Sequence, residues 1–436
     1  MIMHDLSRRR FLTTSAALGA VAVTGVASAE NTVEKKAKVD ASRGKADRCI
    51  FVWLPGGACH IDTWDPKRKS TGRKDPGSYY DSVPTAIRDV RVCEHLSRIA
   101  PLLDRGVLLR TLHHNVTDEH GAATNRLHTG RPTSGTIVYP SIGSVVADQL
   151  GEGSPGVPRY VVMGYPNASR GPGFLGAKGG FIYLTDTKAG PAGLSRPAGV
   201  FVKRQSRRDA LLANMREQYL RRHPTDAHLR NYANLSREAS RLAGPEAMKI
   251  FRLDKEPAER RTAYGGEFGQ RLLLARRLVQ AGSRFVEVTS NLNFKNGTGW
   301  DTHNEGQLKQ HELIRELDQA LAALVLDLEE QKLLDRTLVV VATEFGRPAS
   351  FDGGGGRGHH AKAFSAAMFG GGLKTGQVIG RTDDLGMKIA ADPITVPDLH
   401  ATMYTALGID PAKELYAGDR PVPITDGGRA IAQVLG

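Results

Sequence analysis

A short, wholly apolar run at residues 338–341 constrains the fold of this chain more than any other feature of its sequence. The run consists of one leucine and three valines with polar residues on both sides, which is the pattern of a strand buried on both faces of a parallel sheet. Glu344 follows closely after it. Since the carboxyl ends of parallel strands form the edge at which ligands bind in open α/β sheets, this acidic group is predicted to lie at such an edge.

Further apolar runs of strand length alternate with amphipathic segments along the chain. Strands are predicted at residues 49–54, 107–112, 157–163, 284–288, 337–343 and 364–369. Helices are predicted at about 119–128, 305–333 and 396–407, and in several pieces between 205 and 282. Such alternation is typical of an α/β protein with a mostly parallel central sheet flanked by helices. No Pro/Gly-rich break separates two self-sufficient cores, so we predict a single domain over residues 48–436 with a helical insertion at about 203–282.

The amino-terminal residues have the organisation of an export signal. A twin-arginine motif at residues 7–12 is followed by a mildly apolar stretch and by small residues up to Ala29. We therefore predict a twin-arginine signal peptide at residues 1–29, recognised by the twin-arginine export machinery, and a flexible leader at 30–47. The apolar stretch is too short for a membrane span, although an uncleaved signal acting as a tether stays open. The mature chain is expected to lack a transmembrane span and to act in the periplasm or outside the cell.

The chain is basic, with 59 Lys and Arg residues against 46 Asp and Glu residues and a formal net charge of +13. The basic excess is concentrated between residues 203 and 261, and such a surface attracts polyanions. For an exported protein these would be sulfated or acidic glycans, anionic lipids or wall polymers. Nucleic acid is not expected, because aromatic residues are few in this stretch and no nucleic-acid-binding motif occurs. The simpler explanation is a solvated helical face.

Acidic and histidine side chains recur where the predicted strands end. They are His60, Asp62 and Asp65 after the first strand, His120 and His128 with Thr124 on the helix after the second, and Asp301, His303, Glu344, His359 and His360 further along. Such side chains, meeting at one sheet edge, can form a divalent-metal site, and their mixture leaves zinc, manganese and calcium open. The three cysteines form no CxxC motif, which disfavours a thiolate site. Taken singly, each residue has a simpler explanation, such as a helix cap at Asp301 or an ion pair between Glu344 and Arg347.

Several motifs resemble those of the DUF1501 family of exported bacterial proteins. They are Pro55-Gly56-Gly57 with residues 60–67, His120 through Gly130, Gly299-Trp300-Asp301-Thr302-His303, residues 337–347, and Arg357-Gly358-His359. Together these motifs extend over nearly the whole mature chain. The family is itself similar to the alkaline phosphatase and sulfatase superfamily. The resemblance therefore implies an alkaline-phosphatase-like fold.

The chain departs from the superfamily pattern at positions that carry chemistry. Glu344-Phe345 stands where the hydrolases have an Asp-His or Asp-Asn metal pair, and Pro55-Gly56-Gly57 stands where their first strand ends in a ligating Asp. His120 occupies the place of the sulfatase nucleophile, and none of the three cysteines is followed by the required Pro and Arg. A formylglycine sulfatase is therefore excluded. Gly358 replaces a carboxylate that the DUF1501 pattern would supply.

These observations predict an exported metal-dependent hydrolase of phosphate, sulfate or related anionic esters, acting on a small molecule or a glycan. The metal ligands would be Asp301, His303, Glu344 and His359, completed by His60 or Asp62; the nucleophile or general base would be His120 or Thr124; and the anion clamp would be Arg131 or Arg357. The alternative is a non-catalytic relative that binds an anionic glycan or a cell-surface partner. The altered metal pair and the missing standard nucleophile favour that alternative.

Overall fold

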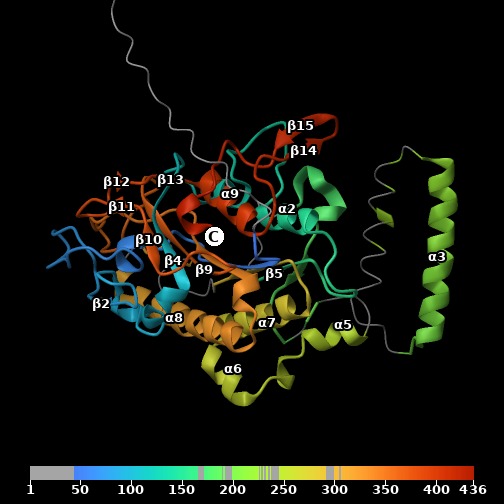
Figure 1. The fold of residues 1–436 in the computed structure, drawn as a ribbon, viewed down its shortest axis with the longest axis horizontal. Coiled ribbons are helices and arrows are strands. Elements are labelled where there is room, and N and C mark those ends of the chain that lie inside the picture. Colours follow the sequence, from blue (N-terminus) through green and yellow to red (C-terminus); the bar gives the residue numbers. More distant parts are fainter. Residues whose placement is uncertain are drawn as a thin grey trace, which may run out of the picture. The chain divides into compact units, whose positions relative to one another are not determined.

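The computed structural model describes residues 44–436, apart from 165–170, 189, 192–198, 225, 227–228, 230–231, 234–235, 237–244, 291–298 and 304–305. The predicted signal peptide and most of the predicted leader lie outside the described residues. Residues Val39–Gly436 form one unit, whose secondary structure is shown in Figure 1. None of the helices in the described part of the chain has the length and apolar character needed to cross a membrane.

A nine-stranded sheet forms the centre of this unit. Its strands are β1 (Arg48–Trp53), β4 (Gly106–His113), β5 (Tyr160–Met163), β6 (Ile182–Leu184), β7 (Phe285–Thr289), β8 (Thr337–Ala342), β9 (Phe364–Gly370), β10 (Gln377–Ile379) and β13 (Ile394–Thr395). The order is β10–β4–β9–β8–β1–β7–β5–β6, with β13 also paired to β4. Among these pairings, only those of β9 with β4 and β8 are antiparallel. The predicted class, a mostly parallel sheet flanked by helices, is confirmed.

Most of the remaining regular structure of the described residues is helical. The helices are α1 (His120–Thr129), α2 (Ile142–Gln149), α3 (Val202–Arg222), α5 (Pro245–Ile250), α6 (Ala258–Tyr264), α7 (Glu267–Ala281), α8 (Gln307–Glu330) and α9 (Val396–Ala406). Small two-stranded sheets join β2 (Ser82–Pro84) to β3 (Arg91–Cys93), β11 (Arg381–Thr382) to β12 (Ile389–Ala391), and β14 (Glu414–Ala417) to β15 (Arg420–Pro423). Strand β6 was not predicted from the sequence, because its three residues follow a Gly-rich segment.

Helices cover both faces of the sheet, which explains why its central strands β1 and β8 are apolar after their first residues. In β1, Ile50 and Val52 belong to the core cluster that includes α7 and α8, whereas Phe51 and Trp53 belong to the cluster that includes α2 and α9. Figure 1 shows the two helix pairs on opposite sides of the strands. Since successive strand residues point to opposite faces, a strand covered on both sides needs an apolar side chain at every position. The run at 338–341, within β8, meets this requirement.

The three cysteines are free thiols in the structure and all are buried. Burial raises the pKa of the Cys49 and Cys59 thiols well above the ordinary value. Burial likewise raises the pKa of Cys93 to about 12. Cys49 lies in the central strand β1 and Cys93 in β3, so each is held by packing. No disulfide joins any two of the three cysteines.

Helix α9 places a buried histidine against α1. The helix begins with a capping box, in which the Thr395 hydroxyl and the Asp398 carboxylate each bond to the backbone of the other residue. One turn further on, His400 donates its Nε2–H to the carbonyl oxygen of Leu127 in α1 at 2.7 Å. Burial lowers the pKa of His400 to about 4, because the charged imidazolium would lose its hydration, and the bond to Leu127 opposes this only in part.

Acidification should destabilise the protein through His400. The unfolded side chain takes up a proton near pH 6.5, whereas the folded one does so only near pH 4. The unfolded state therefore binds more protons within this window, and the free energy of unfolding falls as the pH drops through it, by up to roughly 3 kcal/mol from this residue. Denaturant titrations from pH 7 to pH 4 would measure the fall.

A glutamine at this position keeps a donor for Leu127 but does not titrate. His400→Gln should therefore flatten the pH dependence of the unfolding free energy, while the same change at the exposed His223 should leave it as in the unmodified chain. An equal pH dependence in His400→Gln and the unmodified chain would contradict the assignment.

Candidate metal centre

Five candidate residues lie at the carboxyl edge of the parallel strands. His120 begins α1, which follows β4, and Asp301 and His303 follow β7. Glu344 comes two residues after β8, and His359 precedes β9. Since β9 is antiparallel to β8, its beginning lies at the edge where the parallel strands end. The sheet therefore brings together segments that are far apart in the sequence, as the positions at strand ends predicted.

Hydrogen bonds from the loop after β1 fix the positions of the segments that carry Asp301 and Glu344. The amide of Trp300 donates to the carbonyl oxygen of Pro55 at 2.8 Å, which places Asp301 beside the β1 loop. The amide of Gly56 donates to Glu344 Oε1 at 2.7 Å. The first residues of the loop are thus tied to the segments that follow β7 and β8. The Pro-Gly-Gly motif supplies backbone groups here in place of a ligating carboxylate.

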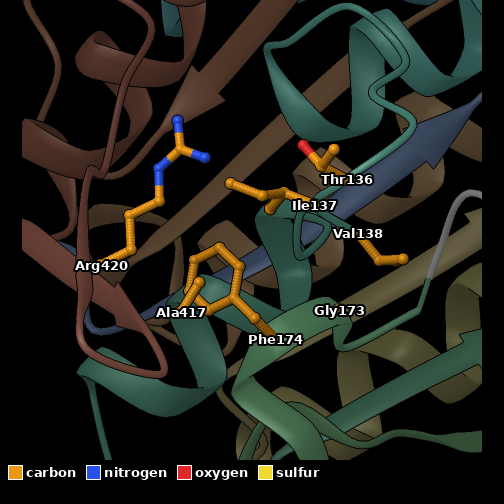
Figure 2. Close-up of a pocket in the computed structure, with 7 residues that line it drawn as sticks. All are labelled: Thr136, Ile137, Val138, Gly173, Phe174, Ala417 and Arg420. Atoms are coloured by element: carbon orange, nitrogen blue, oxygen red, sulfur yellow. The ribbon is translucent and has the colours of Figure 1, made fainter. Parts of the chain in front are cut away.

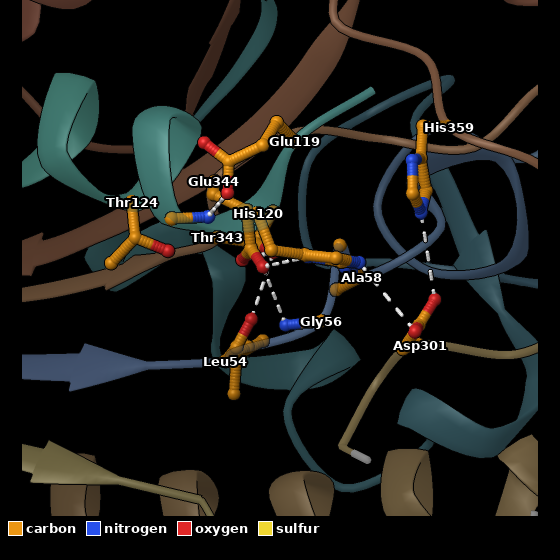
Figure 3. Close-up of polar contacts among 12 residues, drawn as sticks. Leu54, Gly56, Ala58, Glu119, His120, Thr124, Asp301, Thr343, Glu344 and His359 are labelled. Carbon is orange, nitrogen blue, oxygen red and sulfur yellow. Dashed lines mark hydrogen bonds and ion pairs between the residues drawn. The ribbon is translucent and has the colours of Figure 1, made fainter. Parts of the chain in front are cut away.

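Three imidazole nitrogens approach the carboxylate of Asp301. The Nε2 of His120 is 3.5 Å from Oδ2, and those of His303 and His359 are 3.1 and 3.6 Å from Oδ1. The nitrogens of His303 and His359 are 3.3 Å apart. Donors about 2.0–2.1 Å from a tetrahedral zinc ion are separated by about 3.3 Å, so this spacing suits a cation. His120, Asp301 and His359 form the group of described residues whose donor atoms all lie within 4.8 Å of one another (Figure 3).

Two further carboxylates fix the orientation of the histidine rings. His120 donates its Nδ1–H to Glu344 Oε1 at 2.8 Å, and His303 donates its Nδ1–H to Asp352 Oδ2 at 3.2 Å. In each ring the other nitrogen, Nε2, is left facing Asp301. Carboxylates that hold the remote nitrogen of a metal-binding histidine are the usual outer partners of metal sites.

The Nε2 of His120 is buried and makes no hydrogen bond in the described structure. Burial alone would lower the pKa of His120, but its contacts with Asp301 and Glu344 outweigh burial and raise the pKa to about 9. Burial conversely favours a higher pKa for Asp301, while the contacts with His120, His359 and Arg347 hold it well below its ordinary value. The carboxylate of Asp301 thus faces a nitrogen that requires either a proton or a cation beside it.

A buried arginine anchors Asp301 from the opposite side. Arg347 is wholly inaccessible and donates to Asp301 Oδ1 at 2.5 Å. The same guanidinium donates to the carbonyl oxygens of Gly56 and Gly57, and to that of Arg357 at 2.7 Å. Gly57 has a φ of 76°, and a Cβ at this residue would lie 2.5 Å from the Phe345 ring. Glycine is therefore needed for the close approach, and Arg347 pairs with Asp301 where the sequence had suggested Glu344.

Two predicted site residues bind each other. Arg357 donates to Asp62 at 2.9 Å, and both side chains are fully buried. The guanidinium also donates to the carbonyl oxygens of Gly77 and Ala349 at 2.7 and 2.6 Å, while Asp62 accepts from the amide of Tyr79. These contacts favour a structural role for Asp62 and Arg357, since neither side chain is left free to bind a cation or a substrate anion.

The other predicted residues also have partners of their own. His60 is buried, with its Nε2 bonded to the carbonyl oxygen of Gly386 at 2.8 Å, and burial lowers its pKa to about 4. Thr124 lies one turn after His120 in α1 and is 4% exposed. Arg131, beyond the end of α1, donates to Asp426 at 3.2 Å and so attaches the C-terminal segment. His60 is not among the described residues whose donor atoms cluster at Asp301, and Arg131 bonds the C-terminal segment.

Sequence reasoning missed Asp352. This residue opens the Gly-rich loop and accepts from the amides of Gly354 and Gly356 at 3.1 and 2.9 Å, in addition to its contact with His303. An Asp directly before a run of glycines is a typical turn residue, and that signal could have drawn attention to it. Its part in orienting His303 depends on a contact across 49 residues, which sequence spacing does not reveal.

A cavity of about 360 Å³ lies elsewhere on the chain (Figure 2). It is formed by the loop before α2, the 3₁₀ helix Gly173–Gly179 and the β14–β15 hairpin. Its lining residues are Thr136, Ile137, Val138, Gly173, Phe174, Ala417 and Arg420. It contains none of the donor residues around Asp301, so the candidate site is assigned from its side chains and not from this cavity.

The sequence matches the family described as "Protein of unknown function (DUF1501)" over residues 46–435. The chain belongs to the DUF1501 family. This result confirms the resemblance identified from the motifs. No curated protein matches the chain.

Several solved structures are similar to that of this DUF1501 protein. A sulfatase from Pseudoalteromonas sp. is 14% identical, with a TM-score of 0.40 over 85% of this chain and 69% of the sulfatase. A protein of the alkaline phosphatase superfamily from Vibrio parahaemolyticus is 12% identical, with a TM-score of 0.41 over 92% and 72%. The lipoteichoic acid synthase LtaP from Listeria monocytogenes is 10% identical, with a TM-score of 0.41 over 91% and 78%. Of these three proteins, the one from Vibrio parahaemolyticus is described as a member of the alkaline phosphatase superfamily.

Removing one partner of the buried Asp62–Arg357 pair should strongly destabilise the fold. Asp62→Asn leaves the Arg357 guanidinium buried without a counter-charge, and the expected loss is about 3–5 kcal/mol in the free energy of unfolding. The exposed pair Arg68–Asp75, with a similar distance of 2.6 Å, provides the control. Asp75→Asn should leave stability almost unchanged, because water and salt screen that pair. If the two substitutions lowered the free energy of unfolding equally in denaturant titrations, the structural role of Asp62 would be refuted.

Proposed function

We propose that this DUF1501 protein is a metal-dependent hydrolase of anionic esters, with His120, Asp301, His303 and His359 as the residues that hold the cation. The observation that carries the proposal is the buried Nε2 of His120, which faces Asp301 without a hydrogen bond. Export through the twin-arginine pathway, with cleavage after Ala29, belongs to the same proposal. The residues that motivate it lie outside the described part of the chain.

The donor set suits a divalent cation of intermediate softness. Three imidazole nitrogens and one carboxylate are ligands typical of zinc, and carboxylate oxygen also suits manganese or calcium. A divalent cation in such a site polarises an ester oxygen and lowers the pKa of water. Asp301 supplies the negative charge that helps to hold a cation, and its lowered pKa keeps that charge present at neutral pH.

The remaining residues of the site hold the donors in place. Glu344, which is 1% exposed, keeps the proton of His120 on Nδ1, so that Nε2 stays directed toward Asp301. Asp352 does the same for His303. Arg347 fixes the position of the Asp301 carboxylate through Oδ1. The sequence predicted Glu344 as a metal ligand. In this proposal Glu344 instead positions His120.

Water is the nucleophile that this arrangement favours. His120 is held between two carboxylates, and Thr124 is buried, so neither is placed to attack a substrate that enters from solvent. In the proposed reaction a water oxygen attacks the phosphorus or sulfur atom, and the bond from that atom to the ester oxygen breaks. The alcohol leaves with one proton of the water, and the phosphate or sulfate retains the oxygen.

A non-catalytic, anion-binding relative is the second candidate, and one observation favours it. Arg347 already bonds Oδ1 of Asp301, and a further contact, with His303 Nε2 at 3.4 Å, involves a nitrogen that the hydrolase would need for its cation. A site whose donors are satisfied by an arginine needs no metal. The two candidates therefore differ in whether the purified protein retains a cation.

Metal content and ester hydrolysis should be lost together when the central donors are altered. Asp301→Asn and His359→Gln preserve side-chain size but remove a charge or a ligand nitrogen, and either should lower bound metal and aryl phosphate or sulfate hydrolysis by at least about 100-fold. Elemental analysis and hydrolysis of chromogenic esters would measure both. His360→Gln is the matched control, since the neighbouring His360 bonds the carbonyl oxygen of Met387 instead. Metal-free protein that hydrolyses no ester would reject the hydrolase and support the second candidate.

Glu344 allows the positioning argument to be tested separately. Glu344→Gln still accepts a hydrogen bond from His120 but carries no charge, so metal affinity should fall by about 10–100-fold without loss of the fold. Competition with a chelating dye would measure the affinity. A metal affinity equal to that of the unmodified chain would show that Glu344 does not position His120.

A further inference from the structure

Helix α3 (Val202–Arg222) buries none of its side chains, although it is one of the longest helices in the described structure. By contrast, ten of the fifteen residues of α7 are buried, because one face of this helix packs on the sheet. In proteins, most of the stability of a helix comes from the packing of its apolar face. The contacts of α3 with the other described residues therefore do not account for its amphipathic sequence.

The apolar residues of α3 form one exposed stripe. Leu211, Met215 and Tyr219 follow one another at intervals of four residues, so they lie along one face, and Leu212 lies beside them. Leu211 and Met215 are 62% and 60% exposed. Phe201, directly before the helix, is 78% exposed. Contiguous exposed apolar side chains of this size mark a surface that binds something.

The same helix is strongly basic. Its cationic residues are Lys203, Arg204, Arg207, Arg208, Arg216, Arg221 and Arg222, against the acidic residues Asp209 and Glu217. Arg221 forms an i,i+4 pair with Glu217 at 3.7 Å. The cations occupy both ends of the helix and flank the apolar stripe. Long basic side chains of this kind extend toward anionic groups while their aliphatic stems cover apolar surface.

We propose that α3 lies in the plane of a membrane surface rich in anionic phospholipid. The stripe from Leu211 to Tyr219 would insert between the headgroups, and the flanking Lys and Arg side chains would contact lipid phosphates. A sulfated glycan would match the charge but not the apolar stripe. A second copy of α3 would match the stripe, but it would bring two strongly basic helices together. The charges of α3 likewise disfavour a membrane-crossing position.

Vesicle cosedimentation of the chain without its predicted signal would test the proposal. We expect binding to vesicles of phosphatidylcholine with phosphatidylglycerol that is at least about tenfold tighter than to phosphatidylcholine alone, and weaker at high salt. Leu211→Ser with Met215→Ser should reduce this binding about tenfold or more, and so should Arg207→Gln with Arg208→Gln.

Matched controls lie outside the helix. Leu326→Ser removes an apolar side chain of α8 that is 48% exposed, and Arg381→Gln removes an exposed cation of β11; both variants should bind vesicles as the unmodified chain does. Circular dichroism would verify that every variant is folded. The proposal would be overturned by binding to heparin without binding to vesicles, by self-association that Leu211→Ser abolishes while vesicles are ignored, or by equal binding to neutral and anionic vesicles.

Discussion

The buried guanidinium of Arg347 joins the segments from which the candidate site is built. Its five donors contact the loop after β1, the loop before β9 and the carboxylate of Asp301, which follows β7. An uncompensated guanidinium at such depth would be very unfavourable, so these contacts must form together when the sheet assembles. The position of Asp301, and hence of the histidines around it, is therefore set by a residue that reaches no solvent.

Charge in this region is arranged in two separate layers. The Asp62–Arg357 pair lies fully inside and bonds backbone carbonyls of the surrounding loops. Around Asp301 the charges are partly accessible, and His120 and His303 each have one nitrogen fixed by a second carboxylate while the other nitrogen faces Asp301. The buried Asp62–Arg357 pair holds the surrounding loops in place. The groups around Asp301 offer nitrogen and oxygen atoms that can bind a ligand. This division explains why residues of similar type, at similar positions after strands, differ in what they can bind.

The sequence predicted the sheet well because the physical requirement is local. A strand covered on both faces is expected to be apolar along its buried length, and β1 and β8 satisfy this at every position after their first residues, Arg48 and Thr337. The same reasoning placed Asp301, His303 and His359 at one edge. It could not predict which of the nearby carboxylates would face the histidine nitrogens, since that depends on partners far away in sequence. Glu344 bonds Gly56 and His120, across 288 and 224 residues, and Asp62 bonds Arg357 across 295.

The three enclosed thiols bear on where the chain can mature. Because Cys49, Cys59 and Cys93 are unpaired and shielded, no oxidation step is needed to complete the covalent structure. Their raised pKa values keep them in the protonated, unreactive form. The polypeptide can therefore complete its covalent structure under reducing conditions. Neither disulfide isomerases nor a particular redox poise is required for its assembly.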